Sequence, residues 1–296
     1  MNLCFLPFSV VVSISARKMS YFVSRGRKNC DKIKRNVFLG FQDAEGKEDI
    51  MKIIEYGNPE GKRILCIPGV FMAAECFRRL SQELPEYRLV CVTLDGFHPG
   101  SEEFGGLEQQ TEKLVRMLRD RGTTSFEMVL GLSMGTIFSV RLAKNPALKI
   151  RKLFLDGAVN FYRSKVKYVV QAAIYLIFRH FMITAKKDKQ KSSNDLKKVY
   201  EGDWGEIIQV CRASLTEPSL RVMARLLADY TLEPGVEQPM YLIFGGKEDN
   251  IKVNSRVVRA LYPDARIMVK EGYNHLEYLN RQPEEYGKLV RKVLEK

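Results

Sequence analysis

The chain has 296 residues, of which 45% are hydrophobic and 28% charged, and its formal net charge is +13. A chain of this length and composition can bury a sizeable core, which argues against a disordered or fibrous protein. Its six cysteines are scattered without the spacing of a disulfide framework, so we expect a reducing compartment and a cytoplasmic location.

The positive charge is unevenly distributed along the chain. Residues 1–36 carry eight Lys or Arg and one acidic residue, and residues 151–200 carry twelve Lys or Arg against three acidic residues. The rest of the chain is close to neutral, so we expect no nucleic-acid partner. We interpret residues 1–36 as a disordered basic arm. Its apolar segment, residues 4–12, resembles the apolar region of a secretory signal, although no positive charge precedes it apart from the terminal amine. The segment is too short to span a bilayer, and Met19 is an alternative start of the protein.

Apolar runs that alternate with helix-like stretches predict an α/β fold with a mostly parallel sheet, covered by helices on both faces. Strands are expected at residues 51–56, 63–67, 88–94, 126–130, 152–155, 240–244 and 266–269. Helices are expected between them, including residues 109–121, 253–261 and 283–295. The sheet and its helices would form a core from residues 37–158 and 234–296, and residues 159–233 break the alternation and predict an inserted helical cap.

The pentapeptide Gly131-Leu132-Ser133-Met134-Gly135 lies between an expected strand and an expected helix. A serine on such a sharp strand-to-helix turn takes a strained backbone conformation that lifts its hydroxyl clear of the sheet. Larger side chains at the two glycines would collide with neighbouring backbone. We therefore take Ser133 as the candidate nucleophile, and a serine hydroxyl needs a base within hydrogen-bond reach.

Carboxylates and one histidine follow the later expected strands. Asp156 ends one strand, Glu248 and Asp249 follow the next, and His275 lies in the loop after the last. The carboxyl ends of parallel strands meet at one edge of a sheet, where open α/β sheets bind their ligands. The chain order nucleophile, acid, base differs from the orders of the chymotrypsin and subtilisin types.

Taken together, these features resemble the α/β-hydrolase superfamily, and within it the serine hydrolases of carboxylesterase type that carry a helical cap. The resemblance runs from about Met51 to the C-terminus and weakens between about Val159 and Glu233. The segments that carry it are residues 67–70, 95–101, 131–135, 245–249 and 271–275.

The resemblance implies that His275 is the general base and that Asp249 orients its imidazole, because the spacing Gly246-x-x-Asp249 matches the family pattern. Glu248, the immediate neighbour, is an alternative acid. Asp156 is another, since a few branches of the family place the acid there, although we favour a turn-capping role for it.

An oxyanion hole is also implied, formed by the backbone N–H groups of Val70 and Met134. The family usually has His-Gly before the first of these donors, and this chain has Pro68-Gly69. Proline lacks an N–H, but the required donor lies two residues further on, so the hole is not lost.

The two other histidines are given structural roles. His98 and Asp95 lie in a Gly/Pro-rich turn and are interpreted as turn architecture, and His180 is expected to face solvent or lipid. No Cys or His pair has metal-ligand spacing and there is no dinucleotide or phosphate-loop motif, so we expect no metal and no cofactor.

The expected cap contains an apolar stretch, residues 165–178, that Arg179 and His180 are predicted to end. We interpret it as a helix that roofs the substrate cleft. The alternative is an interfacial helix that makes a weak contact with a membrane surface, helped by the basic residues 186–191. Trp204 is given a packing role.

The sequence therefore predicts a serine hydrolase that cleaves a carboxylic ester or thioester of a small, hydrophobic substrate through an acyl-enzyme. The alternatives are a lipase that binds lipid surfaces, an acyltransferase, and a non-catalytic receptor or scaffold with the same fold.

Overall fold

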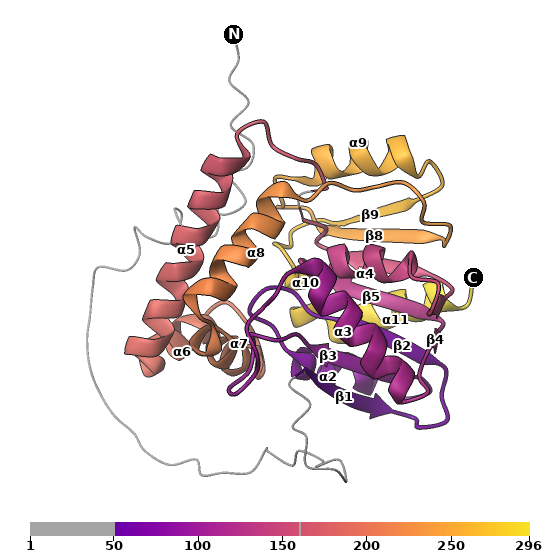
Figure 1. Cartoon of the computed structure of the whole chain (residues 1–296). Helices are drawn as coiled ribbons and strands as arrows, with labels where there is room; N and C mark the ends of the chain where they lie inside the picture. Colours follow the sequence, from indigo (N-terminus) through magenta and orange to yellow (C-terminus); the bar gives the residue numbers. More distant parts are fainter. Residues whose placement is uncertain (1–50, 160) are drawn as a thin grey trace.

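The structure, a computed structural model, describes residues 51–159 and 161–296. The expectations for residues 1–36 and for the start of the core, residues 37–50, lie outside the described residues. Within them, nine strands and the helices between them form the layered α/β architecture of Figure 1.

Seven strands form one sheet in the order β1-β3-β2-β5-β7-β8-β9, and β4 and β6 pair separately. The strands are β1 (Lys52–Gly57), β2 (Arg63–Ile67), β3 (Arg88–Thr93), β4 (Ser125–Phe126), β5 (Met128–Leu132), β6 (Lys149–Ile150), β7 (Leu153–Asp156), β8 (Met240–Gly245) and β9 (Arg266–Lys270). Every pairing is parallel except that of β1 with β3. The mostly parallel sheet is therefore confirmed.

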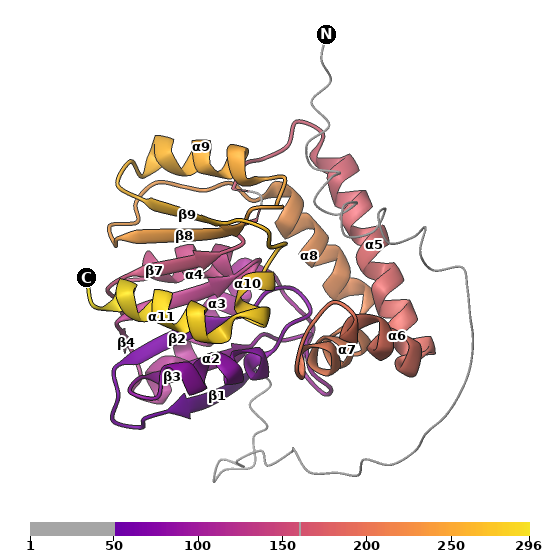
Figure 2. The same cartoon turned by 180° about the vertical axis from the view of Figure 1, so that it is seen from behind.

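The central strands are apolar because both faces of the sheet are covered. Every residue of β5, β7 and β8 is buried. Helices α3 (Leu107–Asp120) and α4 (Gly135–Ala143) cover one face (Figure 1), and α2 (Arg78–Glu83) and α11 (Pro283–Leu294) cover the other (Figure 2). A strand buried on both faces has no polar side to alternate with, which explains its continuous apolar run.

The remaining helices complete the chain. They are the 3₁₀ turn η1 (Ala74–Phe77), α5 (Lys167–Lys187), α6 (Lys189–Lys197), α7 (Trp204–Ser214), α8 (Glu217–Asp229), α9 (Ile251–Leu261) and α10 (Glu277–Arg281). Helices α5 to α8 lie together beside one edge of the sheet, between β7 and β8 in the chain (Figures 1 and 2). We use the name cap for α5–α8.

Two expectations about element boundaries are wrong. The expected strand at residues 126–130 is split at Glu127, because Phe126 pairs with Ile150 in the small sheet while Met128 begins the central strand β5. The apolar helix of the cap does not end at Arg179, because α5 continues to Lys187.

Polar contacts fasten the cap to the core. Trp204, at the start of α7, is almost fully buried and donates its indole N–H to the carbonyl of Cys76 at 3.0 Å. Asp203 pairs with Arg78, and the backbone N–H of Glu201 donates to the side chain of Asn280 at 2.8 Å. These contacts place the first turn of α7 directly on the core.

Candidate active site

Ser133 occupies the turn between β5 and α4 with a backbone φ of 51°. The glycines around it allow this turn. A Cβ on Gly131 would lie 2.3 Å from the hydroxyl of Ser139, and one on Gly135 would lie 2.2 Å from the carbonyl of Ile67. Both distances are far inside van der Waals contact, so only glycine fits at either position. The backbone holds the Ser133 side chain at the carboxyl edge of the sheet.

His275 lies in the loop after β9 and faces Ser133. Its Nε2 lies 2.9 Å from the hydroxyl oxygen of Ser133, although 142 positions separate the two residues in the chain. Gly157 packs against the imidazole, because a Cβ at that position would lie 2.5 Å from Cε1. The expected meeting of residues 133 and 275 is present in the structure.

The carboxylate that contacts His275 belongs to Glu248, not Asp249. Its Oε2 lies 2.7 Å from His275 Nδ1, and the side chain is only 4% exposed. The expectation that Asp249 would contact the imidazole is therefore wrong. The physical reason is the tight turn after β8, where the N–H of Gly245 donates to Glu248 Oε1 at 2.7 Å and draws that side chain back over the strand end. Asp249, one position on, is exposed.

The pKa of His275 is raised above its ordinary value of 6.5. Burial alone would lower this pKa, but the negative charge of Glu248 and its hydrogen bond outweigh the burial. The arrangement therefore favours an imidazolium next to the Glu248 carboxylate. A base that becomes positively charged while it accepts a proton from Ser133 would be stabilised in this position.

Asp156 lies at the end of β7, behind the imidazole. Its side chain is buried and accepts a hydrogen bond of 2.9 Å from the hydroxyl of Tyr286, and its backbone carbonyl accepts the N–H of Ser133 at 2.8 Å. Burial, and then the charge of Glu248, raise the pKa of Asp156 to about 7. The contacts of this carboxyl are to Tyr286, whereas the ring nitrogens of His275 face Ser133 and Glu248.

The loop that follows β2 lies against the serine. A Cβ on Gly69 would be 2.9 Å from the Ser133 Cβ, so Gly69, the neighbour of Val70 in the chain, packs against the serine side chain. Met134 precedes the first residue of α4, where backbone N–H groups lack helical acceptors. In the described part of the chain, no acceptor is recorded for the N–H of Val70 or of Met134. Their role as an oxyanion hole stays a prediction.

Three non-glycine residues have a positive φ within the described residues: Phe71 at 61°, Ser133 at 51° and Leu276 at 57°. Ser133 is itself a residue of the candidate site, Phe71 follows Val70, and Leu276 follows His275. Such conformations cost roughly 1–3 kcal/mol each and persist where the surrounding structure imposes them. The backbone conformations at these three residues are therefore imposed by the packing around them and not by the intrinsic preference of the residue types.

The other histidines take different positions. His98 is in a turn where its carbonyl accepts the hydroxyl of Ser101 at 2.9 Å, and Asp95 is buried and paired with Lys113 at 2.7 Å. His180 is exposed on α5. Among the described residues, no three or more His, Cys, Asp or Glu side chains are grouped to hold a metal ion.

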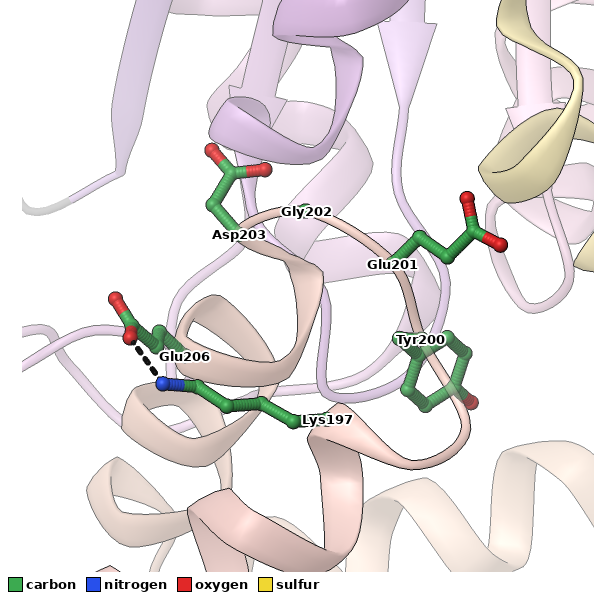
Figure 3. Close-up of a pocket in the computed structure, with 6 residues that line it drawn as sticks. All are labelled: Lys197, Tyr200, Glu201, Gly202, Asp203 and Glu206. Atoms are coloured by element: carbon green, nitrogen blue, oxygen red, sulfur yellow. Dashed lines mark ion pairs between the residues drawn. The ribbon is translucent and has the colours of Figure 1, made fainter.

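A surface hollow lies apart from these residues, at the turn between α6 and α7. Figure 3 shows its lining, which consists of Lys197, Tyr200, Glu201, Gly202, Asp203 and Glu206. Lys197 and Glu206 form an ion pair of 2.8 Å across it. The hollow contains none of the three residues Ser133, Glu248 and His275, and we assign it no chemistry.

Two residues of the site were not identified as such from the sequence. Glu248 was given only as an alternative to its neighbour, and the signal for it was the position directly after the Gly245-Gly246-Lys247 turn. Gly157 is absent from the residues predicted from the sequence, although a glycine directly after a strand-end carboxylate is a signal for close approach of another group.

Comparisons with known proteins agree with this architecture. No protein-family model matches the chain. It is 23% identical to Lipase 1 of Psychrobacter immobilis over 268 residues, which cover 83% of this chain and 82% of that protein.

Among solved structures, a protein of Desulfitobacterium hafniense assigned to the α/β-hydrolase family superposes with a TM-score of 0.66 at 20% identity, over 82% of this chain and 100% of that one. A thermophilic esterase from Thermogutta terrifontis superposes with a TM-score of 0.61 at 18% identity, over 83% of this chain and 93% of the other. The chain therefore has the fold of these proteins.

Proposed function

We propose that this chain, which has the α/β-hydrolase fold, is a serine hydrolase that cleaves a carboxylic ester or thioester of a small, hydrophobic substrate. The observation that carries the proposal is the continuous line of hydrogen bonds from Ser133 through His275 to Glu248, 2.9 Å and 2.7 Å long. Nucleophile, base and orienting acid in this geometry are the parts that acyl transfer to a serine needs.

In the proposed reaction, Ser133 Oγ attacks the substrate carbonyl while His275 Nε2 takes its proton. The N–H groups of Val70 and Met134 donate to the oxyanion that develops, and Glu248 stabilises the imidazolium. His275 then gives its proton to the leaving alcohol or thiol, and the acyl group stays on Ser133. Water, deprotonated by His275, attacks this acyl-enzyme and releases the acid and the free serine.

The names of the relatives are more specific support for ester hydrolysis than the shared fold is. Lipase 1 of Psychrobacter immobilis and the Thermogutta terrifontis esterase carry names that denote ester cleavage. Solved structures of the same fold also include an enol-lactonase and a bromoperoxidase. Because one fold carries several chemistries, the proposal depends on the residues of the site.

An aromatic cluster next to the loop that follows β2 supports a hydrophobic substrate. The ring of Phe71, which directly follows Val70, lies 4.8 Å from that of Phe178 and 6.1 Å from that of Phe181, both on α5. The cap thus contributes apolar surface close to the proposed oxyanion donors. We expect acyl groups with a short hydrocarbon chain to be preferred over acetate.

The direct test of the proposal is covalent labelling with a fluorophosphonate probe, combined with turnover of p-nitrophenyl esters of increasing chain length. We expect labelling of the wild-type protein and no labelling of the Ser133→Ala variant. A folded wild-type protein that neither reacts with the probe nor cleaves any ester would contradict the proposal and favour a receptor or scaffold. Product analysis with an added alcohol would separate hydrolysis from acyl transfer.

A second candidate function, a lipase that works at a lipid surface, is favoured by the outer side of α5. This helix is long and apolar enough to cross a membrane by length and composition, but it packs against α7 and α8. Its outward side chains Tyr168, Val169 and Leu176 are 75%, 59% and 62% exposed. Exposed lysines lie at both ends of this helix, at positions 165, 186 and 187. An anionic bilayer could therefore take up the apolar side chains and pair its phosphates with the lysines.

Co-sedimentation with vesicles of phosphatidylserine at low salt tests this second candidate. We expect the wild type to bind these vesicles and the binding to fall with added salt. We expect Leu176→Asp to bind severalfold less than the wild type. Val210, which is 43% exposed on α7, provides the matched control, and Val210→Asp should bind as the wild type does. Equal binding of both variants, or no binding by the wild type, would exclude a lipid-docking role for α5.

A further inference from the structure

Arg212, near the end of α7, is placed where the cap meets the loop that carries Val70. Its guanidinium carbon lies 5.3 Å from the ring centre of Phe71 and 4.2 Å from that of Phe181. The charge is therefore held between an aromatic ring of the core and one of the cap. The ring of Phe71 is buried and that of Phe181 is partly buried.

The positive charge of Arg212 has no carboxylate partner in the described part of the chain. No ion pair or hydrogen bond from its side chain is recorded among residues 51–159 and 161–296, and its buried Nε lacks an acceptor. Among the other arginines of the cap, Arg179 is paired with Glu217 at 2.6 Å, and Arg221 lies 5.0 Å from the ring centre of Tyr175. Arg212 is partly buried, and a charge held partly out of water is stabilised by an anionic group placed next to it.

The guanidinium stays charged at neutral pH. Burial lowers the pKa of Arg212 to about 10, which is still well above the working range of a histidine base. The contacts with two phenyl rings stabilise the cation in part, since ring faces attract positive charge. They leave the edge of the guanidinium, which carries its N–H donors, without an acceptor from these rings.

A short path of contacts joins this charge to the candidate nucleophile. Gly69 packs against Ser133, and Phe71, two residues further on, packs against Arg212. On this basis we propose that Arg212 binds a carboxylate carried by the substrate, so that the preferred substrate is an ester with an apolar body and one anionic end. The inference rests on the proposed ester hydrolysis and specifies its substrate class.

A carboxylate fits this position better than a phosphate does. One guanidinium can neutralise one negative charge through two parallel hydrogen bonds, which is the geometry of an arginine–carboxylate pair. A phosphate monoester would bring nearly two charges into a surface formed by Phe71 and Phe181, where no second cation is recorded among the described residues. The aromatic lining therefore favours a singly charged group.

The experiment compares matched pairs of substrates that differ by one charge. On the acyl side, the pair is mono-p-nitrophenyl adipate and its methyl ester. On the alcohol side, the pair is 4-(hexanoyloxy)benzoate and its methyl ester. We expect the wild-type kcat/KM to favour the charged member of at least one pair, and Arg212→Met to reduce that preference about tenfold or more, because the charge-assisted hydrogen bonds to the carboxylate are lost.

Control variants separate recognition from folding. Arg212→Lys keeps the charge and should retain part of the preference. Arg221, whose guanidinium carbon lies 5.0 Å from the ring centre of Tyr175 on the same cap, provides the matched control, and Arg221→Met should leave the preference unchanged. Turnover of p-nitrophenyl hexanoate, which is neutral, should stay near the wild-type value in Arg221→Met, and in the Arg212 variants it is the reference against which turnover of the charged substrates is compared.

The outcomes distinguish the two proposals. If the wild type does not cleave p-nitrophenyl hexanoate and is not labelled by the fluorophosphonate, the proposed function itself fails. If hexanoate is cleaved but the charged member of neither pair is preferred, or if Arg212→Met lowers all substrates equally, the role of Arg212 in recognition is refuted. Should Arg212→Met not fold, the wild-type preference and the Arg212→Lys variant still decide the question.

Discussion

Replacement of Glu248 by glutamine removes one negative charge from the imidazole and keeps the size of the side chain. In the structure Glu248 Oε2 lies 2.7 Å from His275 Nδ1, and the carboxylate is almost fully buried. Unit charges about 4 Å apart interact by about 4 kcal/mol at an effective dielectric constant of about 20. Loss of that interaction corresponds to a decrease in kcat of about a thousandfold.

A second effect of Glu248→Gln adds to the first. The amide NH₂ group of glutamine can donate to Nδ1, which would leave the imidazole proton on Nε2. With that proton on Nε2, His275 could not accept the proton of Ser133. In serine proteases the equivalent change lowers kcat by about ten thousandfold. We therefore expect Glu248→Gln to retain between about a thousandth and a ten-thousandth of wild-type turnover, with unchanged thermal unfolding.

The assay is hydrolysis of p-nitrophenyl hexanoate, and Asp249→Asn is the matched control. Asp249 is the exposed neighbour, so its neutralisation should change kcat by less than about threefold, since exposed charge pairs contribute little. A larger loss in Asp249→Asn than in Glu248→Gln would refute our assignment of the acid and restore the expectation drawn from the sequence pattern.

Other predictions concern the same edge of the sheet. Because Glu248 raises the pKa of His275 above 6.5, kcat/KM should fall as the pH drops through that raised pKa, and Glu248→Gln should move this limb to lower pH in a pH–rate profile. Gly157→Ala would place a Cβ 2.5 Å from His275 Cε1 at a residue with a φ of 60°, so we expect kcat to fall about a hundredfold and the thermal stability to decrease. A variant with wild-type kcat would show that the ring can move aside. Gly131→Ala would place a Cβ 2.3 Å from the Ser139 hydroxyl, and urea unfolding should show a loss of about 1–3 kcal/mol, whereas an unchanged midpoint would contradict the tight packing.

The sequence was sufficient for those parts of the fold that depend on local pattern. Apolar runs located the strands of the sheet, since residues of β5, β7 and β8 are buried on both faces. The glycines at positions 131 and 135 marked the turn at Ser133, because a tight backbone approach leaves a direct signature in residue type. The loop position of His275 was sufficient to bring it to Ser133.

Features that depend on side-chain reach could not be read from the pattern. Glu248 and Asp249 are neighbouring carboxylates, and the choice between them is made by the hydrogen bond from Gly245, which no spacing rule reveals. The extension of α5 past Arg179 accompanies its packing against α7 and α8, which are distant segments of the chain. The sequence also could not show that Arg212 lies between Phe71 and Phe181 without a carboxylate partner among the described residues, because these residues are distant in the chain.

The three non-glycine residues with left-handed backbone, Phe71, Ser133 and Leu276, have a consequence for how this molecule can change over time. Glycine or asparagine would adopt these conformations more easily than the residues present. At Phe71 and Leu276, however, the side chains are buried, and their removal would cost about 2–5 kcal/mol, more than the strain relieved. A laboratory selection for heat resistance alone should therefore replace Ser133 before the other two, and the sturdier protein would lack the proposed nucleophile.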